Sequence, residues 1–189
     1  ADRMLSREET MYSEFLEAEL SKITPVVNTN GSDSAMLDNT LEFLVMNGLP
    51  LPLAVMMTIP EPWTNNQAMN QERKDFYQYY ATMMEPWDGP ASILFSDGDI
   101  MGAVLDRNGL RPSRYYVTKD DYLILSSEVG VLPIDESRIQ SKDRLKPGKM
   151  LLVDTVAGRL IDDDELKTSY ATKQPYGEWL DKNLLHLHE

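Results

Sequence analysis

Residues 91–105 carry the sequence ASILFSDGDIMGAVL, in which two apolar runs flank a turn at residues 96–99. Runs of β-branched and aromatic residues separated by an Asp-Gly turn are typical of an antiparallel hairpin. We therefore predict two paired strands, at residues 91–95 and 100–105. Four more short apolar runs lie between turn signals and are also predicted to be strands: residues 115–118, 122–126, 149–154 and 158–161, the last two as a pair.

The residues before the hairpin have the period of helices. Apolar side chains recur at helical spacing in four segments, which are predicted to be helices: residues 3–23, 35–46, 51–59 and 70–85. Ser32 or Asp33 is the expected N-cap of the second helix, and Gly48 its C-terminal stop. Asp162 is expected to cap a short acidic helix to about Tyr170, followed by polar, loosely held residues. Helices first and hairpin-linked strands second predict the α+β class, with an antiparallel sheet packed against helices.

Charge and composition exclude several kinds of partner. Acidic residues outnumber basic ones by 31 to 18, which gives a formal net charge of -13. Nucleic-acid backbones and anionic membranes would be repelled by such a surface, so neither is expected as a partner. No run approaches the roughly 20 apolar residues that a membrane span requires. No secretory signal opens the chain, and a cytoplasmic location is expected.

The inventory of reactive side chains narrows the chemistry. The chain has no cysteine, which excludes thiolate nucleophiles, disulfides and thiolate metal sites from these 189 residues. The two histidines, His186 and His188, lie in the last four residues, where a frayed terminus is favoured over a metal site. No metal site is therefore expected in the chain.

The sequence GSDS at residues 31–34 is the first candidate site. A carboxylate at a helix start is held by backbone N–H groups, and such a fixed anion suits the ammonium group of a substrate. The alternative is a plain N-cap, which spacing alone favours for Asp33 and its neighbour Ser32.

The sequence DRNGLRP at residues 106–112 is the second candidate. Arg107 and Arg111 bracket a turn formed by Asn108 and Gly109, so the loop can present a guanidinium to a carboxylate. A turn whose arginines bind their own acidic neighbours is equally consistent with the pattern.

Two further polar motifs favour structural roles. Ser127 and Glu128 are adjacent on an extended chain, so their side chains point to opposite faces and do not form a nucleophile–base pair. The acidic run at residues 162–165 lacks the spacing of a cation-binding loop and favours helix capping and a solvated face.

Taken together and in order, these motifs resemble the class II glutamine amidotransferase domain of glutamate synthase large subunits. The similarity runs from about residue 1 to residue 179. It rests on SDS at 32–34, LDN at 37–39, MEPWDGP at 84–90, LDRNGLRP at 105–112, SEVG at 127–130 and LKPGKM at 145–150. The resemblance implies an αββα sandwich of the N-terminal-nucleophile hydrolase type, of which this chain is the second half.

In that family an N-terminal cysteine attacks the side-chain amide of glutamine, with its own α-amino group as base. An Asn-Gly pair forms the oxyanion hole, and an upstream arginine binds the substrate carboxylate. Ammonia passes to a flavin-containing domain and is combined with 2-oxoglutarate to give glutamate. FMN and an iron–sulfur cluster are thus implied for the full-length enzyme, and no cofactor for this chain. L-glutamine and the rest of the large subunit are the implied partners, with a small subunit as a further candidate.

The family's nucleophile, oxyanion hole and carboxylate-binding arginine belong to segments that precede this chain, so no catalytic residue is expected here. Asp33 matches the family's aspartate that binds the α-amino group of glutamine. The remaining matched positions are expected to be supporting scaffold: Ser32, Arg107, Asn108, Gly109, Arg111 and Glu128.

The resemblance predicts one partial domain over residues 1–189, helical over 1–86, mainly β over 87–161, with a C-terminal helix and tail over 162–189. Both sheets would lack strands from upstream, so the chain is expected to be inactive alone and to self-associate through an exposed apolar face. Two alternatives remain open: a non-catalytic module that binds glutamine or a protein, and a structural or regulatory domain without a small-molecule site.

Overall fold

The computed structural model describes residues 2–186, which form two compact units. Residues 2–88 and 168–186 make up the first unit, and residues 89–167 the second. The chain combines helices with antiparallel sheets, so the expected α+β class is confirmed. His188 lies outside the described residues. Within residues 2–186, no helix has the length and apolarity needed to cross a membrane.

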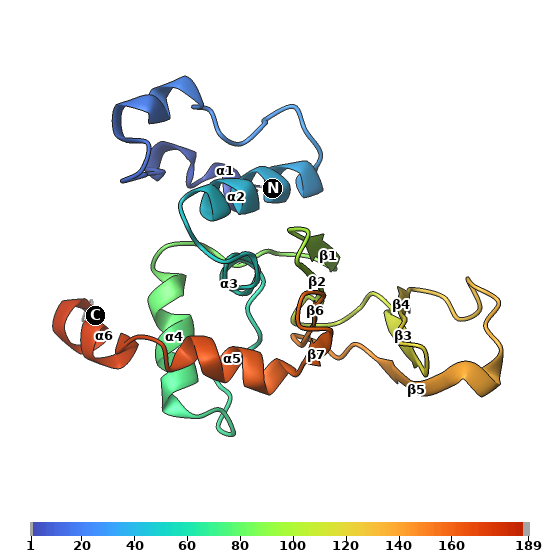
Figure 1. The fold of residues 1–189 in the computed structure, drawn as a ribbon. Coiled ribbons are helices and arrows are strands. Elements are labelled where there is room, and N and C mark those ends of the chain that lie inside the picture. Colours follow the sequence, from blue (N-terminus) through green and yellow to red (C-terminus); the bar gives the residue numbers. More distant parts are fainter. Residues whose placement is uncertain (1, 187–189) are drawn as a thin grey trace. The chain divides into compact units, whose positions relative to one another are not determined.

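The first unit is built from helices (Figure 1). They are α1 (Asp2–Leu5), α2 (Asp33–Met46), α3 (Leu51–Thr58), α4 (Gln71–Ala81) and α6 (Tyr176–Asn183), together with the second half of α5 (Asp163–Ala171). The three predicted helices at residues 35–46, 51–59 and 70–85 correspond to α2, α3 and α4.

Helix α2 begins and ends as its sequence predicts. The Ser32 side chain accepts a hydrogen bond from the Ala35 amide at 3.2 Å, so Ser32, one of the two expected N-caps, has that role. Gly48 follows the helix with a φ of 87°, a conformation that favours glycine, and its amide donates to the Val45 carbonyl.

Helix α3 is buried almost all round. Every residue from Pro52 to Thr58 is buried, and the helix packs against both α2 and α4. Pro52 lies in the first helical turn, where its missing N–H has no partner within the helix. An apolar surface on all sides is typical of a central helix, and α3 forms the core of the first unit.

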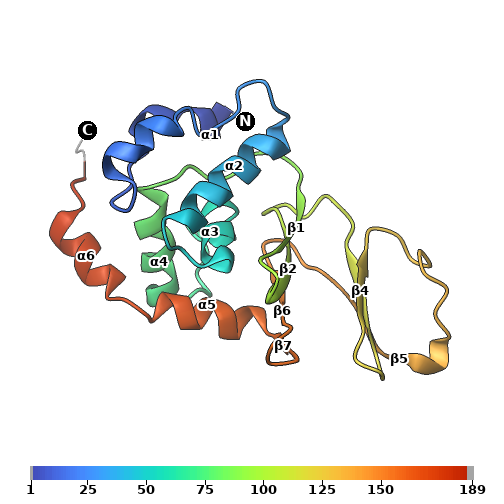
Figure 2. The same ribbon diagram turned by 45° about the horizontal axis from the view of Figure 1, so that its top comes forward.

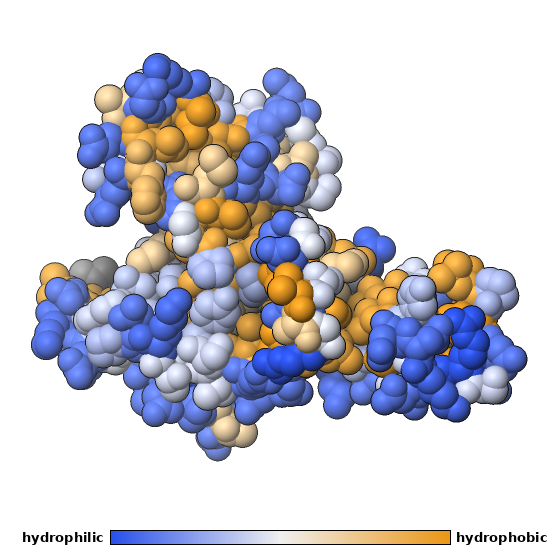
Figure 3. All heavy atoms as spheres, viewed as in Figure 1, coloured by the Kyte–Doolittle hydropathy of each residue, from blue (hydrophilic) through white to orange (hydrophobic). Residues whose placement is uncertain are grey.

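The prediction of one long helix over residues 3–23 is wrong. The described part of this segment contains only the short α1 and two 3-10 helices, η1 (Glu8–Thr10) and η2 (Glu17–Lys22). Tyr12 and Phe15, which the helical pattern placed on a buried face, are 71% and 76% exposed. In Figure 3, hydrophobic side chains reach the surface over this segment. A continuous helix is excluded because the backbone is extended at Met11 (φ -63°, ψ 130°) and Glu17 has a φ of 42°.

Two corrections concern helix α4 and the residues after α5. Helix α4 ends at Ala81, before the predicted Glu85, because the next amides, of Thr82 and Met83, bond to carbonyls three residues back instead of four. The C-terminal residues expected to be loosely held form α6, whose Tyr176 is only 3% exposed. Aromatic rings from α4 and α6 pack together at centroid distances of 5.1 to 5.7 Å, which explains why α6 forms.

The second unit holds two antiparallel sheets, drawn separately in Figure 2. The four-stranded sheet has the order β1-β2-β6-β7, and its strands are β1 (Ser92–Ser96), β2 (Ile100–Leu105), β6 (Met150–Asp154) and β7 (Arg159–Ile161). The three-stranded sheet has the order β4-β3-β5, and its strands are β4 (Leu123–Ser126), β3 (Arg114–Thr118) and β5 (Ile139–Arg144). The predicted hairpin and the predicted pairing of the last two strands are both confirmed.

Strand β5 was not predicted. Its sequence, IQSKDR, has one apolar residue, and every position after Ile139 is exposed. A short 3-10 helix, η3 (Glu136–Arg138), precedes it. The strand forms because it supplies backbone partners to β3 over most of that strand's length. Apolar side chains from both sheets then share one cluster: Ala103, Leu105 and Leu145, with Leu125 and Leu151 packed against them.

Candidate functional site

Asp33 is the first residue of α2, directly after the Ser32 cap. Its side chain is exposed, and within residues 2–186 its carboxylate has no hydrogen bond or ion pair. The cap is completed by a 3.0 Å contact between the hydroxyls of Ser32 and Ser34. Helix capping is thus performed by the serines, and the Asp33 carboxylate is left available at the positive end of the helix dipole.

The loop before Asp33 is held by its own polar groups. The Asn28 amide donates to Oδ1 of Asn39, on α2, at 3.0 Å, and the Asn28 carbonyl accepts from the Gly31 amide at 3.0 Å. Oδ1 of Asn28 also accepts from the Asn30 amide at 3.0 Å. These bonds fix the loop against the helix that carries Asp33. Asn28 and Asn39 were not identified as site residues from the sequence.

The second candidate loop joins β2 to β3 in the second unit, and its first residue, Asp106, makes most of its hydrogen bonds. Asp106 is 4% exposed, and its two carboxylate oxygens accept from the Ala91 amide at 3.1 Å and the Asn108 amide at 2.9 Å. Its carbonyl accepts from the amides of Gly109 and Gly148 at 3.0 and 3.2 Å. Asp106 was not among the predicted site residues. The available signal was an Asp two residues before an Asn-Gly turn, typical of an Asx turn.

The structure brings two predicted motifs together at this loop. Gly109 has a φ of 59° and lies against Pro147, and the Leu145 amide donates to the Ser113 carbonyl at 2.9 Å. The motif at residues 105–112 therefore packs on the motif at residues 145–150. Both belong to the second unit, whereas Asp33 and Ser32 belong to the first.

The other predicted scaffold residues are exposed. Arg107, Asn108 and Arg111 lie on the same loop with solvent-exposed side chains. Glu128 lies after β4, where its amide donates to the Ser126 hydroxyl at 3.2 Å. Among the described residues, the Glu128 side chain has no hydrogen bond or ion pair, so no polar side-chain contact joins it to the loop of Arg107.

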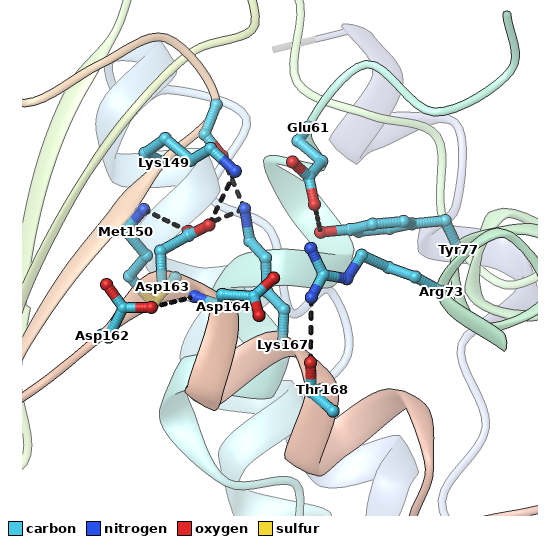
Figure 4. Close-up of polar contacts among 11 residues, drawn as sticks. Glu61, Arg73, Tyr77, Lys149, Met150, Asp162, Asp163, Asp164, Lys167 and Thr168 are labelled. Atoms are coloured by element: carbon cyan, nitrogen blue, oxygen red, sulfur yellow. Dashed lines mark hydrogen bonds and ion pairs between the residues drawn. The ribbon is translucent and has the colours of Figure 1, made fainter. Parts of the chain in front are cut away.

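The acidic run at residues 162–165 has more definite structural roles than the sequence indicated. Oδ1 of Asp162 accepts from the Asp164 amide at 2.8 Å, the expected capping interaction, and Glu165 pairs with Arg159 at 2.6 Å. Asp163 instead accepts from the Met150 amide at 2.8 Å and from the ammonium groups of two lysines. Figure 4 shows these contacts converging on its carboxylate.

The two lysines bound to Asp163 differ in burial. Lys149 is half-exposed and lies 2.9 Å from the carboxylate, whereas the Lys167 side chain is 3% exposed and lies 2.8 Å away. Lys167 also donates to the Gly148 carbonyl at 2.8 Å. Burial alone would raise the pKa of Asp163, but the Lys167 charge and the hydrogen bonds outweigh it and lower that pKa. Asp163 therefore connects the motif at residues 145–150 to helix α5.

A buried polar network lies in the first unit. The Tyr77 hydroxyl donates to the Glu61 carboxylate at 3.1 Å, and the Arg73 guanidinium donates to the Thr168 hydroxyl at 3.0 Å (Figure 4). Glu61, Arg73 and Tyr77 are at most 9% exposed. Charged side chains are rarely this buried without partners, so the network holds the corner after α3 against α4.

The side chains present do not fit the iron–sulfur cluster implied for a full-length glutamate synthase. Iron–sulfur clusters are held by cysteine thiolates, and the chain has no cysteine. Across residues 2–186, no group of three or more His, Cys, Asp or Glu side chains is arranged to hold a metal ion.

Comparison with known proteins identifies the class. The sequence profile of the class II glutamine amidotransferases matches residues 1–179, so the chain belongs to that family. A glutamate synthase [NADPH] large chain from Bacillus subtilis is 53% identical over 184 residues, which are 97% of this chain and 12% of that protein. A glutamate synthase [NADH] from Schizosaccharomyces pombe is 48% identical over 185 residues, or 97% of this chain and 9% of that protein.

A ferredoxin-dependent glutamate synthase 2 from Synechocystis is 47% identical over 180 residues, which are 94% of this chain and 12% of the relative. The resemblance to the amidotransferase domain of glutamate synthase large subunits is therefore confirmed. The chain spans only about an eighth or less of the length of these relatives.

Proposed function

We propose that the chain is part of a glutaminase domain that hydrolyses L-glutamine to glutamate and ammonia, and that Asp33 binds the α-amino group of the substrate. The observation that carries this proposal is the free, exposed carboxylate of Asp33 at the start of α2, in a chain of the class II amidotransferase family. A carboxylate at this position offers an ammonium group a charge-assisted hydrogen bond.

The chain's contribution to the reaction is recognition of the substrate. Hydrolysis of the side-chain amide by the family's route requires a cysteine thiolate as nucleophile, and these 189 residues contain no cysteine. Asp33 acts by orienting glutamine, so that its amide is presented to groups on other parts of the protein. We further propose that the 189-residue chain alone is inactive and that the complete domain is an αββα sandwich.

The remaining matched residues are proposed to support the site without contacting substrate. Asp106 organises the loop that carries Arg107, Asn108, Gly109 and Arg111. Because Gly109 packs on Pro147, this loop has a fixed backbone. Glu128 is proposed to contribute to the same scaffold.

The whole protein is proposed to use the released ammonia for reductive amination of 2-oxoglutarate. The names of its relatives support this proposal: they are glutamate synthases that use NADPH, NADH or ferredoxin. FMN and an iron–sulfur cluster would then be held by other parts of the polypeptide, and a small subunit is a further proposed partner. Self-association of the isolated chain is proposed from its exposed sheet residues, among them Leu94 and Met101.

Glutamate release by the full-length protein tests the role of Asp33. Asp33→Asn keeps the shape of the side chain and removes its charge, so we expect the KM for glutamine to rise about 10- to 100-fold with a smaller change in kcat. Asp38→Asn is the matched control, because Asp38 is an exposed α2 residue whose side chain has no partner within residues 2–186. An unchanged KM in Asp33→Asn would remove Asp33 from the substrate site.

A further inference from the structure

Glu8 binds a segment far away in the sequence through both oxygens of its carboxylate. Oε1 accepts from the Val26 amide at 2.6 Å, and Oε2 accepts from the Val27 amide at 2.9 Å. Backbone amides bound to an ionised carboxylate form short, charge-assisted hydrogen bonds. Val27 is fully buried, so its amide has little access to water as a replacement partner.

The two bound amides directly precede the loop that leads to Asp33. From Val27 the chain passes to Asn28, whose amide and carbonyl are both hydrogen-bonded, and then to the Ser32 cap of α2. At Gly31 a Cβ would lie 3.2 Å from both the Ala35 Cβ and the Asn28 carbonyl, so the loop is closely packed against the helix start. A shift of residues 26–27 would therefore be transmitted to Asp33.

Glu8 is itself held in place by its neighbours in sequence. Arg7 forms two hydrogen bonds of 2.6 Å to the Glu85 carboxylate, and Arg3 donates to the Pro86 carbonyl at 2.8 Å. Met4 is fully buried. The segment from Arg3 to Glu8 thus contacts the motif at residues 84–90 on one side and residues 26–27 on the other.

We propose that Glu8 is a positioning residue for Asp33: it fixes the backbone of residues 26–27 and thereby the loop that sets the place of the substrate-binding carboxylate. The inference rests on the proposed role of Asp33 in binding glutamine. This role requires both carboxylate oxygens of Glu8 to accept hydrogen bonds, one from the Val26 amide and one from the Val27 amide. A glutamine at this position would present an NH₂ group to one of the two amides, and one hydrogen bond would be lost.

Steady-state kinetics of the full-length protein separate this role from a general structural one. We expect Glu8→Gln to raise the KM for glutamine about tenfold while kcat stays within about twofold, because a displaced binding group weakens substrate binding. Glu9→Gln is the matched control. Glu9 is adjacent and exposed, and its side chain has no partner among the described residues. The KM of the Glu9→Gln variant should therefore match that of the wild type.

Asp33→Asn is measured in the same experiment, so that the proposed role of Glu8 can be rejected without rejecting the proposed role of Asp33. If Asp33→Asn raises the KM and Glu8→Gln does not, Glu8 is not a positioning residue and the proposed function stands. If Asp33→Asn leaves the KM unchanged, the proposed function fails and the role of Glu8 fails with it.

Hydrogen exchange provides a readout that is independent of activity. Glu8→Gln should accelerate exchange of the amides at residues 26–35, and exchange within α4 should stay as in the wild type. Unchanged exchange at residues 26–35 would overturn the proposal whatever the kinetics show. Accelerated exchange throughout both segments would mean general destabilisation, and would also overturn it.

Discussion

Gly109 and Pro147 lie in contact, and there is no room between them for a side chain on Gly109. A Cβ added at Gly109 would lie 2.5 Å from Cγ of Pro147 and 3.1 Å from its Cα. Contacts below 3.0 Å require one of the partners to move, and the pyrrolidine ring of Pro147 cannot rotate away. The contact therefore makes glycine obligatory where the two loop motifs of the second unit meet.

We expect Gly109→Ala to lower the free energy of unfolding by about 3 kcal/mol, through both left-handed backbone strain and the clash with Pro147. Gly158→Ala separates the two effects, because Gly158 has a similar φ of 65° but no atom within 4 Å of its added Cβ. That control should cost only about 1 kcal/mol. Equal losses in urea unfolding of the two variants would show that the contact with Pro147 is unimportant.

Removing the carboxylate of Asp106 should destabilise the second unit. Asp106→Ala leaves the buried Ala91 amide and the Asn108 amide without acceptors, at a cost of about 3 kcal/mol. Asp106→Asn keeps one acceptor oxygen and should lose roughly half as much. The exposed Asp99 side chain has no partner among the described residues, so Asp99→Ala is the control and should stay within about 0.5 kcal/mol of the wild type.

The elements predicted well from sequence are those whose signals are local. Helix α2 has its Ser32 cap and Gly48 stop within the segment, and β1 and β2 are joined by a short Asp-Gly turn. Where the structure depends on distant partners, periodicity failed. Residues 3–23 have a helical apolar pattern, but the backbone leaves the helical conformation at Met11 and Glu17, and the side chains of Arg7 and Glu8 bind groups far along the chain.

Strand β5 and helix α6 were missed because their own sequences carry weak signals for a strand and a helix. Strand β5 is polar and is specified by the unpaired edge of β3. Helix α6 is stabilised by the rings of Tyr176 and Trp179, which pack edge-on or tilted against rings of α4. The candidate site shows the same division. The role of Asp33 was predicted from its motif and stays a prediction, whereas Asp106 was missed because burial, which sequence does not display, is what distinguishes it.

The ion pair of Asp163 and Lys167 should make stability depend on pH. The folded-state pKa of Asp163 lies below its ordinary value of 3.8, so the unfolded chain binds this proton first as pH falls. Stability from this group is therefore complete above about pH 5 and is lost as pH falls through the folded-state pKa.

Asp163→Asn removes the negative charge that lies 2.8 Å from the buried Lys167 ammonium, and we expect a loss of about 3 kcal/mol at pH 7. The gap between wild type and variant should narrow below pH 4, where the wild-type carboxyl also becomes neutral. Unfolding free energies measured from pH 7 to pH 2.5 test this, with Asp99→Asn as the control. A gap that stays constant over that range would contradict the assigned ion pair.

The hydroxyl of Tyr77 offers the last test, because it can be removed with little change in packing. Tyr77 is 2% exposed and donates to Glu61, which is 7% exposed, at 3.1 Å. Tyr77→Phe deletes one donor from a buried carboxylate, and we expect the free energy of unfolding to fall by about 2 kcal/mol. Tyr122→Phe makes the same chemical change at a side chain that is 63% exposed and should cost less than about 0.5 kcal/mol. If both variants unfold at the wild-type urea concentration, the hydrogen bond to Glu61 does not contribute to the stability of the first unit. A loss confined to Tyr77→Phe would show that this buried network holds the corner after α3 against α4.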